Sequence, residues 1–249
     1  MIVVMMDYLL ELRRRWWRRV TENGLKSREI TVKARTLEPE EAIGRPLRRD
    51  YPLLRGKEVM VQAEIGEAVG QAFTDEPASF QGTLKDLYDL DITRNSGRAL
   101  LIAGINATYR LLRLIEGTRH CRDDGPELCA AKISETLFNL YGDVKISLIG
   151  FQPAILSHLL RRFSNIRVTD MDEENIGRSY YGIMIEPYQK NQEVISWSEL
   201  ILATGSTIVN NTIQDILRWS NGKPTYFYGV TIAALACEFN LNRLCFNSL

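Results

Sequence analysis

A stretch in the C-terminal part of the chain combines residue types that bind small polar molecules. Residues 200–212, LILATGSTIVNNT, open with four apolar residues that predict a buried strand over 200–203. Polar residues follow, and those that could contact a ligand are Thr204, Gly205, Ser206, Thr207, Asn210, Asn211 and Thr212. Hydroxyl, amide and main-chain N–H groups at the end of a strand can hold an anion or another polar group. The stretch therefore predicts a ligand-binding loop, and it specifies no reaction.

A second loop of this kind occurs earlier, after a predicted strand at 144–149. It consists of Gly150, Phe151, Gln152 and Pro153, and the proline is placed to open a helix. In the usual strand order of an open α/β sheet, this strand and the one at 200–203 are neighbours. We therefore expect the two loops to face each other across a crevice at the carboxyl edge of the sheet.

The residues after the next predicted strand, 166–170, bear on the kind of ligand. Asp170 comes about 20 residues after Gly150, where dinucleotide-binding folds place the acid that holds a ribose, and Asp172 and Asn175 follow it. The glycine pattern opposes a dinucleotide, because the second glycine that lets main chain approach a pyrophosphate is missing. We expect a smaller ligand or a nucleoside, and not NAD or FAD held in the standard way.

A third cluster of reactive residues lies in a polar segment, 117–127, that we take as a domain boundary. His120 and Cys121 in this segment, and Cys129 just after it, are ligand types for soft or borderline metals. Structural zinc sites usually carry two paired Cys or His motifs, and this sequence has no C-x-x-C pair. His120, Cys121 and Asp170 are therefore candidate metal ligands, with a plain polar loop as the alternative. The cofactor stays open, and a metal ion is one candidate.

The loops of the second half are separated by alternating strand and helix patterns. Predicted strands are 144–149, 166–170, 183–186, 200–203 and 225–228, and predicted helices are 126–141, 153–163, 212–220 and 231–239. Such alternation predicts a parallel sheet with right-handed crossovers, a Rossmann-like three-layer domain over 123–249. His158 falls in the apolar pattern of one helix, so we expect a packed or capping histidine.

The first half of the chain predicts an α+β domain over 25–122. Its predicted strands are 29–34, 58–65 and 68–73, its predicted helices are 80–90 and 97–115, and 36–56 is a long connection. Before it, residues 8–23 predict a helix with Leu9, Leu12, Trp16 and Val20 on one face and arginines on the other. A membrane or a nucleic acid could contact such arginines, but we favour a docking helix, within 1–24, that has a solvated basic face.

Composition limits the classes of function. The 249 residues include 31 basic and 31 acidic side chains, so net charge gives no sign of nucleic-acid binding. Four cysteines in a chain of this length do not make a disulfide framework, and no apolar run reaches the length of a membrane span. We expect a cytoplasmic protein without a signal peptide that starts at Met1, Met5 or Met6. We also expect a homodimer, because two-fold pairing is the commonest assembly.

Four segments carry a resemblance to a known family: VKISLIG at 144–150, VTDMDEENIG at 168–177, LATGSTIVNNT at 202–212 and LLIAGINA at 100–107. They resemble the family described as "Putative heavy-metal chelation". The resemblance covers about residues 25–249 and implies an enolase-N-terminal-like domain followed by a Rossmann-like domain. It implies a polar site between the domains, lined by Gly150, Asp170, Thr204, Gly205, Ser206, Asn210 and Thr212.

Three functions are consistent with these patterns. The first is binding of a polar small molecule or a metal chelate at the crevice beside the Rossmann-like sheet. The alternative is an enzyme acting on a nucleoside-like or pterin-like molecule, although the sequence shows no nucleophile next to a base. The third is a structural protein that docks a partner through the Arg/Trp helix. The sequence leaves open whether a reaction is catalysed.

Overall fold

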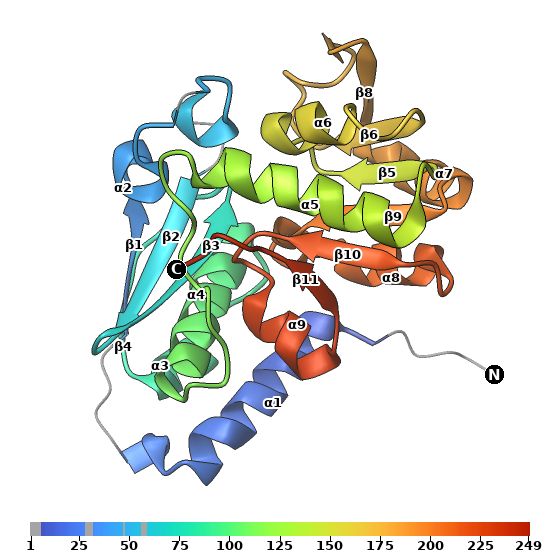
Figure 1. Ribbon diagram of the computed structural model, residues 1–249. Helices are drawn as coiled ribbons and strands as arrows, with labels where there is room; N and C mark the ends of the chain where they lie inside the picture. Colours follow the sequence, from blue (N-terminus) through green and yellow to red (C-terminus); the bar gives the residue numbers. More distant parts are fainter. Residues whose placement is uncertain (1–5, 28–31, 47, 56–58) are drawn as a thin grey trace, which may run out of the picture.

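The computed structural model describes residues 6–27, 32–46, 48–55 and 59–249, which fold around two β-sheets (Figure 1). One sheet is antiparallel and comes from the first half of the chain, and the other is mainly parallel and comes from the second half. This mixed α/β architecture confirms the predicted fold class. Predicted strand residues 29–31 and 58, and the start positions Met1 and Met5, lie outside the described residues.

The antiparallel sheet is backed by one long helix. Its strand order is β3-β2-β1-β4, with β1 (Val32–Leu37), β2 (Val59–Ile65), β3 (Ala68–Thr74) and β4 (Phe80–Gly82). Helix α4 (Asn95–Leu111) packs on this sheet through small residues. A Cβ added at Gly70 of β3 would stand 2.2 Å from the Ala107 main-chain nitrogen, so glycine sets how closely helix and sheet approach.

One predicted helix in this half is wrong in its first part. Residues 80–82 form β4, which pairs with β1, whereas the sequence pattern predicts a helix over 80–90. Helix α3 (Leu84–Tyr88) begins only after Thr83, whose hydroxyl accepts from the Asp86 N–H at 3.2 Å. Pairing with a distant strand overrides the local helical pattern here. The long connection also contains α2 (Pro39–Ile43) and the 3-10 turn η2 (Pro52–Arg55).

The second sheet has the strand order β11-β10-β9-β5-β6-β8-β7. Its strands are β5 (Ile146–Ile149), β6 (Ile166–Asp170), β7 (Ser179–Tyr180), β8 (Ile183–Pro187), β9 (Leu200–Thr204), β10 (Thr225–Tyr228) and β11 (Asn242–Leu244). Among the described strands of this sheet, β7 alone runs antiparallel to its neighbour. Strands β5 and β9 are adjacent, which confirms the predicted switch point between them.

Helices cover both faces of the parallel sheet because successive side chains of a strand point to opposite faces. The helices are α5 (Gly125–Tyr141), α6 (Pro153–Leu159), α7 (Asn191–Trp197), α8 (Ile213–Ser220) and α9 (Ala233–Phe239). Leu148 and Leu202 belong to the cluster formed with α5 and α6, whereas Ile201 and Phe227 belong to the cluster formed with α7, α8 and α9. The sequence patterns did not predict helix α7 or the short strands β7 and β11.

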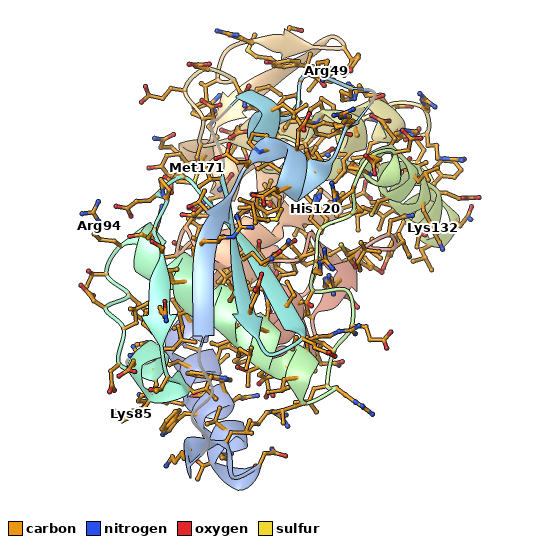
Figure 2. All side chains as sticks on the ribbon, turned by 90° about the vertical axis from the view of Figure 1, so that its left-hand side faces the viewer. Arg49, Lys85, Arg94, His120, Lys132 and Met171 are labelled. Carbon is orange, nitrogen blue, oxygen red and sulfur yellow. The ribbon has the colours of Figure 1, made fainter. Side chains whose placement is uncertain are left out.

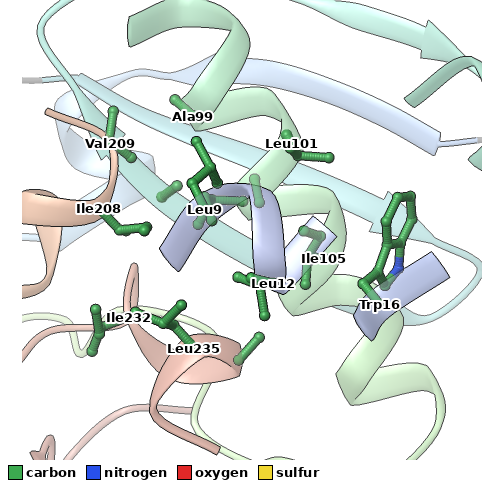
Figure 3. Close-up of a cluster of buried hydrophobic side chains, with 14 of the residues drawn as sticks. Leu9, Leu12, Trp16, Ala99, Leu101, Ile105, Ile208, Val209, Ile232 and Leu235 are labelled. Carbon is green, nitrogen blue, oxygen red and sulfur yellow. The ribbon is translucent and has the colours of Figure 1, made fainter. Parts of the chain in front are cut away.

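Helix α1 (Tyr8–Glu22) lies against elements from both halves of the chain. Figure 3 shows side chains of α1 between those of α4 and those of the C-terminal half, the labelled residues being Leu9, Leu12, Trp16, Ala99, Leu101, Ile105, Ile208, Val209, Ile232 and Leu235. Trp16 is fully buried, and Glu238 of α9 binds both Arg19 and the Tyr109 hydroxyl. These contacts agree with the prediction of a docking helix, but Arg15 and Arg19 of its basic face pair with Glu238, so that face is solvated only in part.

The two hydrophobic clusters cross the predicted domain boundary at residue 122. One cluster contains Trp16 and Phe227, and the other contains Met60 and Leu148. Each half therefore contributes to the core of the other, and the division into folding units at residue 122 stays a prediction. Within the described ranges, no helix has the length and apolar character needed to cross a membrane.

Candidate functional site

A cavity of about 560 Å³ lies between the two sheets, at the carboxyl ends of β5, β6 and β9. Small-molecule sites typically have volumes of about 300–1,000 Å³. The predicted ligand-binding residues that line it are Gly150, Phe151, Gln152, Asp170, Asp172, Asn175, Thr204, Gly205, Ser206, Thr207, Asn210 and Thr212. Phe73, Thr74 and Asp75 at the end of β3 add lining from the antiparallel sheet. The fold thus brings the two predicted loops together around one cavity.

Asn211 is the predicted ligand-binding residue that is not among those lining the cavity. Its main chain has a φ of 57°, in the left-handed region. Its carbonyl and side-chain oxygens accept hydrogen bonds from the Gln214 amide at 2.7 and 2.9 Å. Asn211 therefore shapes the entry into α8, and its predicted contact with a ligand has no support from this arrangement.

The two polar loops touch each other at the sheet edge. Gly150 has a φ of 89°, and a Cβ added there would stand 2.6 Å from Thr204 Cγ2. The Tyr228 hydroxyl at the end of β10 donates to the Gly150 carbonyl oxygen at 2.9 Å. Glycine at this position is required both by the positive φ and by the close approach of Thr204.

The two residues after Gly150 fill the turn with side chains. Phe151 is buried, and its ring packs on the Tyr180 ring with centroids 4.4 Å apart. The Gln152 side-chain oxygen caps α6 by accepting from the Ile155 N–H at 2.6 Å. In a dinucleotide fold a second glycine lets the main chain approach the pyrophosphate at this place, whereas here two side chains occupy the turn. The expectation that NAD or FAD is not bound in the standard way stays a prediction.

The loop after β9 is held by its own hydroxyl groups. The Thr207 hydroxyl donates to the Thr204 carbonyl oxygen at 2.9 Å, and the Ser206 N–H donates to the Thr204 hydroxyl at 3.3 Å. The Asn210 amide donates to the Met171 sulfur at 3.4 Å, which links this loop to the one after β6. The Ser206 and Asn210 side chains make weak contacts within the protein, so they are the groups best placed to bind a ligand.

Asp170 ends β6 and organises the loops around it. Its carboxylate accepts hydrogen bonds from the N–H groups of Phe151 at 2.9 Å, Met171 at 2.6 Å and Asp172 at 2.9 Å. Burial raises the pKa of Asp170, while these main-chain hydrogen bonds act to lower it. The buried Asn175 amide adds a fourth, longer contact at 3.4 Å. The observed role of Asp170 is to position loops, and its contact with a ribose or a metal stays a prediction.

Three thiols from separate parts of the chain line the same cavity. Cys121 precedes α5, Cys129 lies in α5 and Cys245 follows β11. Cys121 and Cys129 are 5% and 8% exposed, and burial raises the pKa of Cys121 to about 12. Hydrogen bonding between Cys129 and Cys245 lowers the pKa of Cys245, and the nearby Arg243 guanidinium acts in the same direction.

His120 lines the cavity beside these thiols. Figure 2 shows it near the middle of the molecule, whereas Met171 lies closer to the edge. Its ring stands edge-on to the Phe73 ring, with centroids 5.4 Å apart. Burial lowers the pKa of His120, which favours the neutral imidazole. Its Nδ1 atom is buried and has no hydrogen-bond partner. An imidazole nitrogen in this state is suited to binding a ligand or a metal.

An ion-pair network stands beside the cavity and joins the two halves. Arg48 donates to the Glu127 carboxylate at 2.7 Å and to the Tyr181 hydroxyl at 2.5 Å. His158 Nε2 lies 3.0 Å from the other oxygen of Glu127. His158 is therefore a packed residue with a polar partner, as the sequence predicts.

Comparison with known proteins finds a family model that matches part of the second half of the chain. Residues 132–242 match the DUF364 family. Its description is "Putative heavy-metal chelation", so the resemblance drawn from the sequence is confirmed over this range. No curated protein matches the sequence.

Two solved DUF364 structures, both of proteins with unknown function, are similar in fold to most of this chain. The one from Pyrococcus horikoshii is 18% identical, has a TM-score of 0.54, and the match covers 90% of this chain and 79% of that one. The one from Desulfitobacterium hafniense is 14% identical, has a TM-score of 0.51, and the match covers 73% of this chain and 72% of that one. Likeness at these identities establishes the fold and leaves the ligand open.

The description of the matching family raises the question of whether the side chains around this cavity could hold a metal ion. Throughout the described residues, no group of three or more His, Cys, Asp or Glu side chains is placed, as it stands, to hold a metal ion. The donors on the wall are nevertheless soft, namely three thiols and the unpartnered His120 Nδ1. A metal in this cavity would therefore bring its own ligands or bind fewer than three side chains.

Sequence reasoning found part of this donor set and missed the rest. His120, Cys121 and Cys129 attract attention because they are close in sequence. Cys245 lies more than a hundred residues later and joins them only because β11 and the C-terminal segment return to the start of α5. No local pattern could have indicated this contact.

Proposed function

We propose that this DUF364 protein binds a small polar molecule, specifically a heavy-metal chelate, in the cavity between its two sheets. One observation carries the proposal: the hydroxyl and amide groups of residues 204–212 and the thiol and imidazole groups around His120 line a single cavity. Hydroxyl and amide donors match the oxygen-rich surface of a carboxylate chelator. Thiol and imidazole groups match an open position on a soft or borderline metal.

The arrangement of side chains favours a chelate over a bare ion. A site for a bare ion is expected to have three or more acidic, thiol or imidazole groups already placed around one point. The described residues contain no such group of side chains. A chelate needs few ligands from the protein, because its organic part satisfies most of the metal. The cavity volume of about 560 Å³ leaves room for such a molecule.

Thermal unfolding with a panel of ligands tests this proposal. Copper(II), zinc(II) and nickel(II) are supplied as free ions and as citrate or histidine complexes, and free citrate and histidine serve as comparators. At a ligand concentration of about 100 Kd, binding adds about 2.7 kcal/mol to the free energy of unfolding. For a chain of this size that corresponds to a rise of about 5–11 °C in Tm.

Variants then place the binding event in the cavity. Ser206→Ala and Asn210→Ala remove polar groups that line the cavity, and we expect each to reduce the shift. Ser179→Ala alters an exposed serine of β7 outside the lining and is the matched control. A panel in which no chelate raises Tm above its free metal and free chelator would refute the proposal. Native mass spectrometry that found a bound nucleoside would support the alternative of an enzyme acting on such a molecule.

A further inference from the structure

The acidic side chains that line the cavity are not balanced by basic ones. They are Asp75, Asp170, Asp172, Glu173 and Glu174. Among the described residues, no lysine or arginine belongs to the lining. The whole chain has 31 basic and 31 acidic side chains, so this imbalance is local. A cavity with such a lining has a negative potential, which attracts positively charged ligands and repels anions.

Two guanidinium groups beside the cavity already have partners within the protein. Arg48 donates to the Glu127 carboxylate at 2.7 Å. Arg243 donates to the carbonyl oxygen of Gly229, a lining residue, at 3.0 Å. By contrast, no ion pair within the described ranges includes Asp172 or Glu173. The negative charge of these two acids is therefore available to a ligand.

The main-chain groups that bind anions in related folds are also occupied. A Rossmann-like sheet usually holds a phosphate at the N–H groups of its first loop. Here the Phe151 N–H of that loop donates to the Asp170 carboxylate at 2.9 Å. The N–H groups of Met171 and Asp172 donate to the same carboxylate at 2.6 and 2.9 Å. An incoming anion would thus meet an acid where other folds offer free N–H donors.

Aromatic rings and an imidazole complete a lining that suits a cation. Tyr51, Phe73, Phe151 and Tyr228 line the cavity, and the faces of such rings attract cations. The buried Nδ1 atom of His120 has no hydrogen-bond partner. One ring nitrogen of a neutral imidazole is an acceptor. With Nδ1 in that form, His120 can accept a hydrogen bond from an amine of the ligand.

We propose that the cavity selects chelates by charge and takes complexes of amine or amino-acid chelators whose net charge is zero or positive. This inference rests on the proposed function and names the class of chelator. Ser206 and Asn210 would bind the carboxylate oxygens of an amino acid, and His120 would bind its amine. Complexes with a net negative charge, such as those of citrate, would be rejected.

The arrangement of the lining gives such a ligand a direction. Glu173 and Glu174 are exposed, and they closely follow Met171 in the loop after β6. Figure 2 shows Met171 nearer the edge of the molecule and His120 near its middle. The acids would therefore attract the complex at the entrance, and the imidazole would bind it inside.

Two tripodal chelators of similar shape test the selection by charge. Tris(2-aminoethyl)amine forms a doubly positive complex with nickel(II), nitrilotriacetate forms a singly negative one, and both leave the same number of positions open on the metal. Isothermal titration calorimetry on the tag-free, full-length protein measures both Kd values. We expect the positive complex to bind at least about 10-fold more tightly at low salt. Equal Kd values, or tighter binding of the negative complex, would overturn the inference.

The dependence on salt and on single charges locates the selection in the cavity. The ratio of the two Kd values should shrink as ionic strength rises, because salt screens exposed charges. Glu173→Gln should weaken binding of the positive complex by about two- to five-fold, the range of a surface charge pair. Glu173→Lys should weaken it further and should strengthen binding of the negative complex.

Glu135 of α5 provides the matched control, because it is an exposed acid outside the lining. Glu135→Gln and Glu135→Lys change the net charge of the protein as the Glu173 variants do, and they should leave both Kd values unchanged. Equal effects at the two positions would mean that overall charge, and not the cavity, decides which complex binds. That result would also overturn the inference.

The two proposals fail in different ways. If the negative complex binds as tightly as the positive one, chelate binding stands and selection by charge is wrong. If neither nickel complex binds but metal-free tris(2-aminoethyl)amine, which is protonated at neutral pH, does bind, selection by charge stands and chelate binding is wrong. If neither complex nor the free amine binds, both proposals are wrong.

Discussion

The contact between the two polar loops can be tested by adding one methyl group. Gly150→Ala places a Cβ 2.6 Å from Thr204 Cγ2 and 3.1 Å from Thr204 Cβ. Ordinary contacts between carbon atoms are about 3.5–4.0 Å, so one loop must move by close to 1 Å. Because these loops form one end of the cavity, the change should weaken both the fold and the binding of a chelate.

The cost can be divided by using a matched glycine. Gly182 has a φ of 84°, close to the 89° of Gly150, and no heavy atom lies within 4 Å of the Cβ that would be added there. The left-handed conformation alone costs an alanine about 1–2 kcal/mol, so that is the expected effect of Gly182→Ala. Overpacking adds about 1–3 kcal/mol at Gly150, which brings its expected loss to about 2–5 kcal/mol.

Urea unfolding followed by circular dichroism measures both losses, and an unchanged slope confirms that the denatured states are comparable. Thr204→Ser removes the contacted methyl group and keeps the hydroxyl, so it should restore part of the loss in a Gly150→Ala background. Gly150→Ala should also abolish the shift in Tm caused by a chelate, whereas Gly182→Ala should keep it. Losses for the two glycines that agree within about 0.5 kcal/mol would refute the inferred contact.

Three further predictions concern the frame that holds the site. Trp16→Ala should lower the free energy of unfolding by about 3–5 kcal/mol because Trp16 is fully buried. Arg18 lies on the exposed face of α1, so Arg18→Ala should change that free energy by less than about 0.5 kcal/mol. Equal effects of the two substitutions in urea unfolding would contradict the docking interpretation. Glu238→Gln should lower the free energy of unfolding by about 1.5–3 kcal/mol in the same assay, since the amide lacks the negative charge that binds Arg19. A change near zero would mean that this ion pair does not form. The Arg35 guanidinium, hydrogen-bonded to Glu41, lowers the pKa of that carboxyl to about 2 from an ordinary value of 4.5. The stabilisation is therefore present above about pH 4.5 and is lost as the pH falls through 2; an NMR titration should show this midpoint, and Arg35→Ala should raise it.

The parallel sheet could be predicted because its signals are local. Strands β5, β6 and β9 are short apolar runs that lead into Gly150, Asp170 and Thr204, and helices α5, α6 and α8 have Pro or Gly at one of their ends. Adjacency of β5 and β9 then follows from the general rules of such sheets. Strand β4 could not be found in this way, because its three residues form a strand only by pairing with β1. The contact of Cys129 with Cys245 likewise depends on the path of the whole chain.

Asp170 shows how the sequence can place a residue correctly and still leave its role open. Spacing predicts a carboxylate at the end of β6, and the structure has one there. In dinucleotide folds the N–H groups of the first loop point toward a pyrophosphate. Here the Phe151 N–H donates to Asp170 at 2.9 Å, so that donor already has an anion inside the protein. The first loop therefore binds the Asp170 carboxylate in place of a pyrophosphate, and it does not need the second glycine that a pyrophosphate would require. The polar groups left to meet a ligand are then those of the opposite loop, Ser206 and Asn210, together with the thiols.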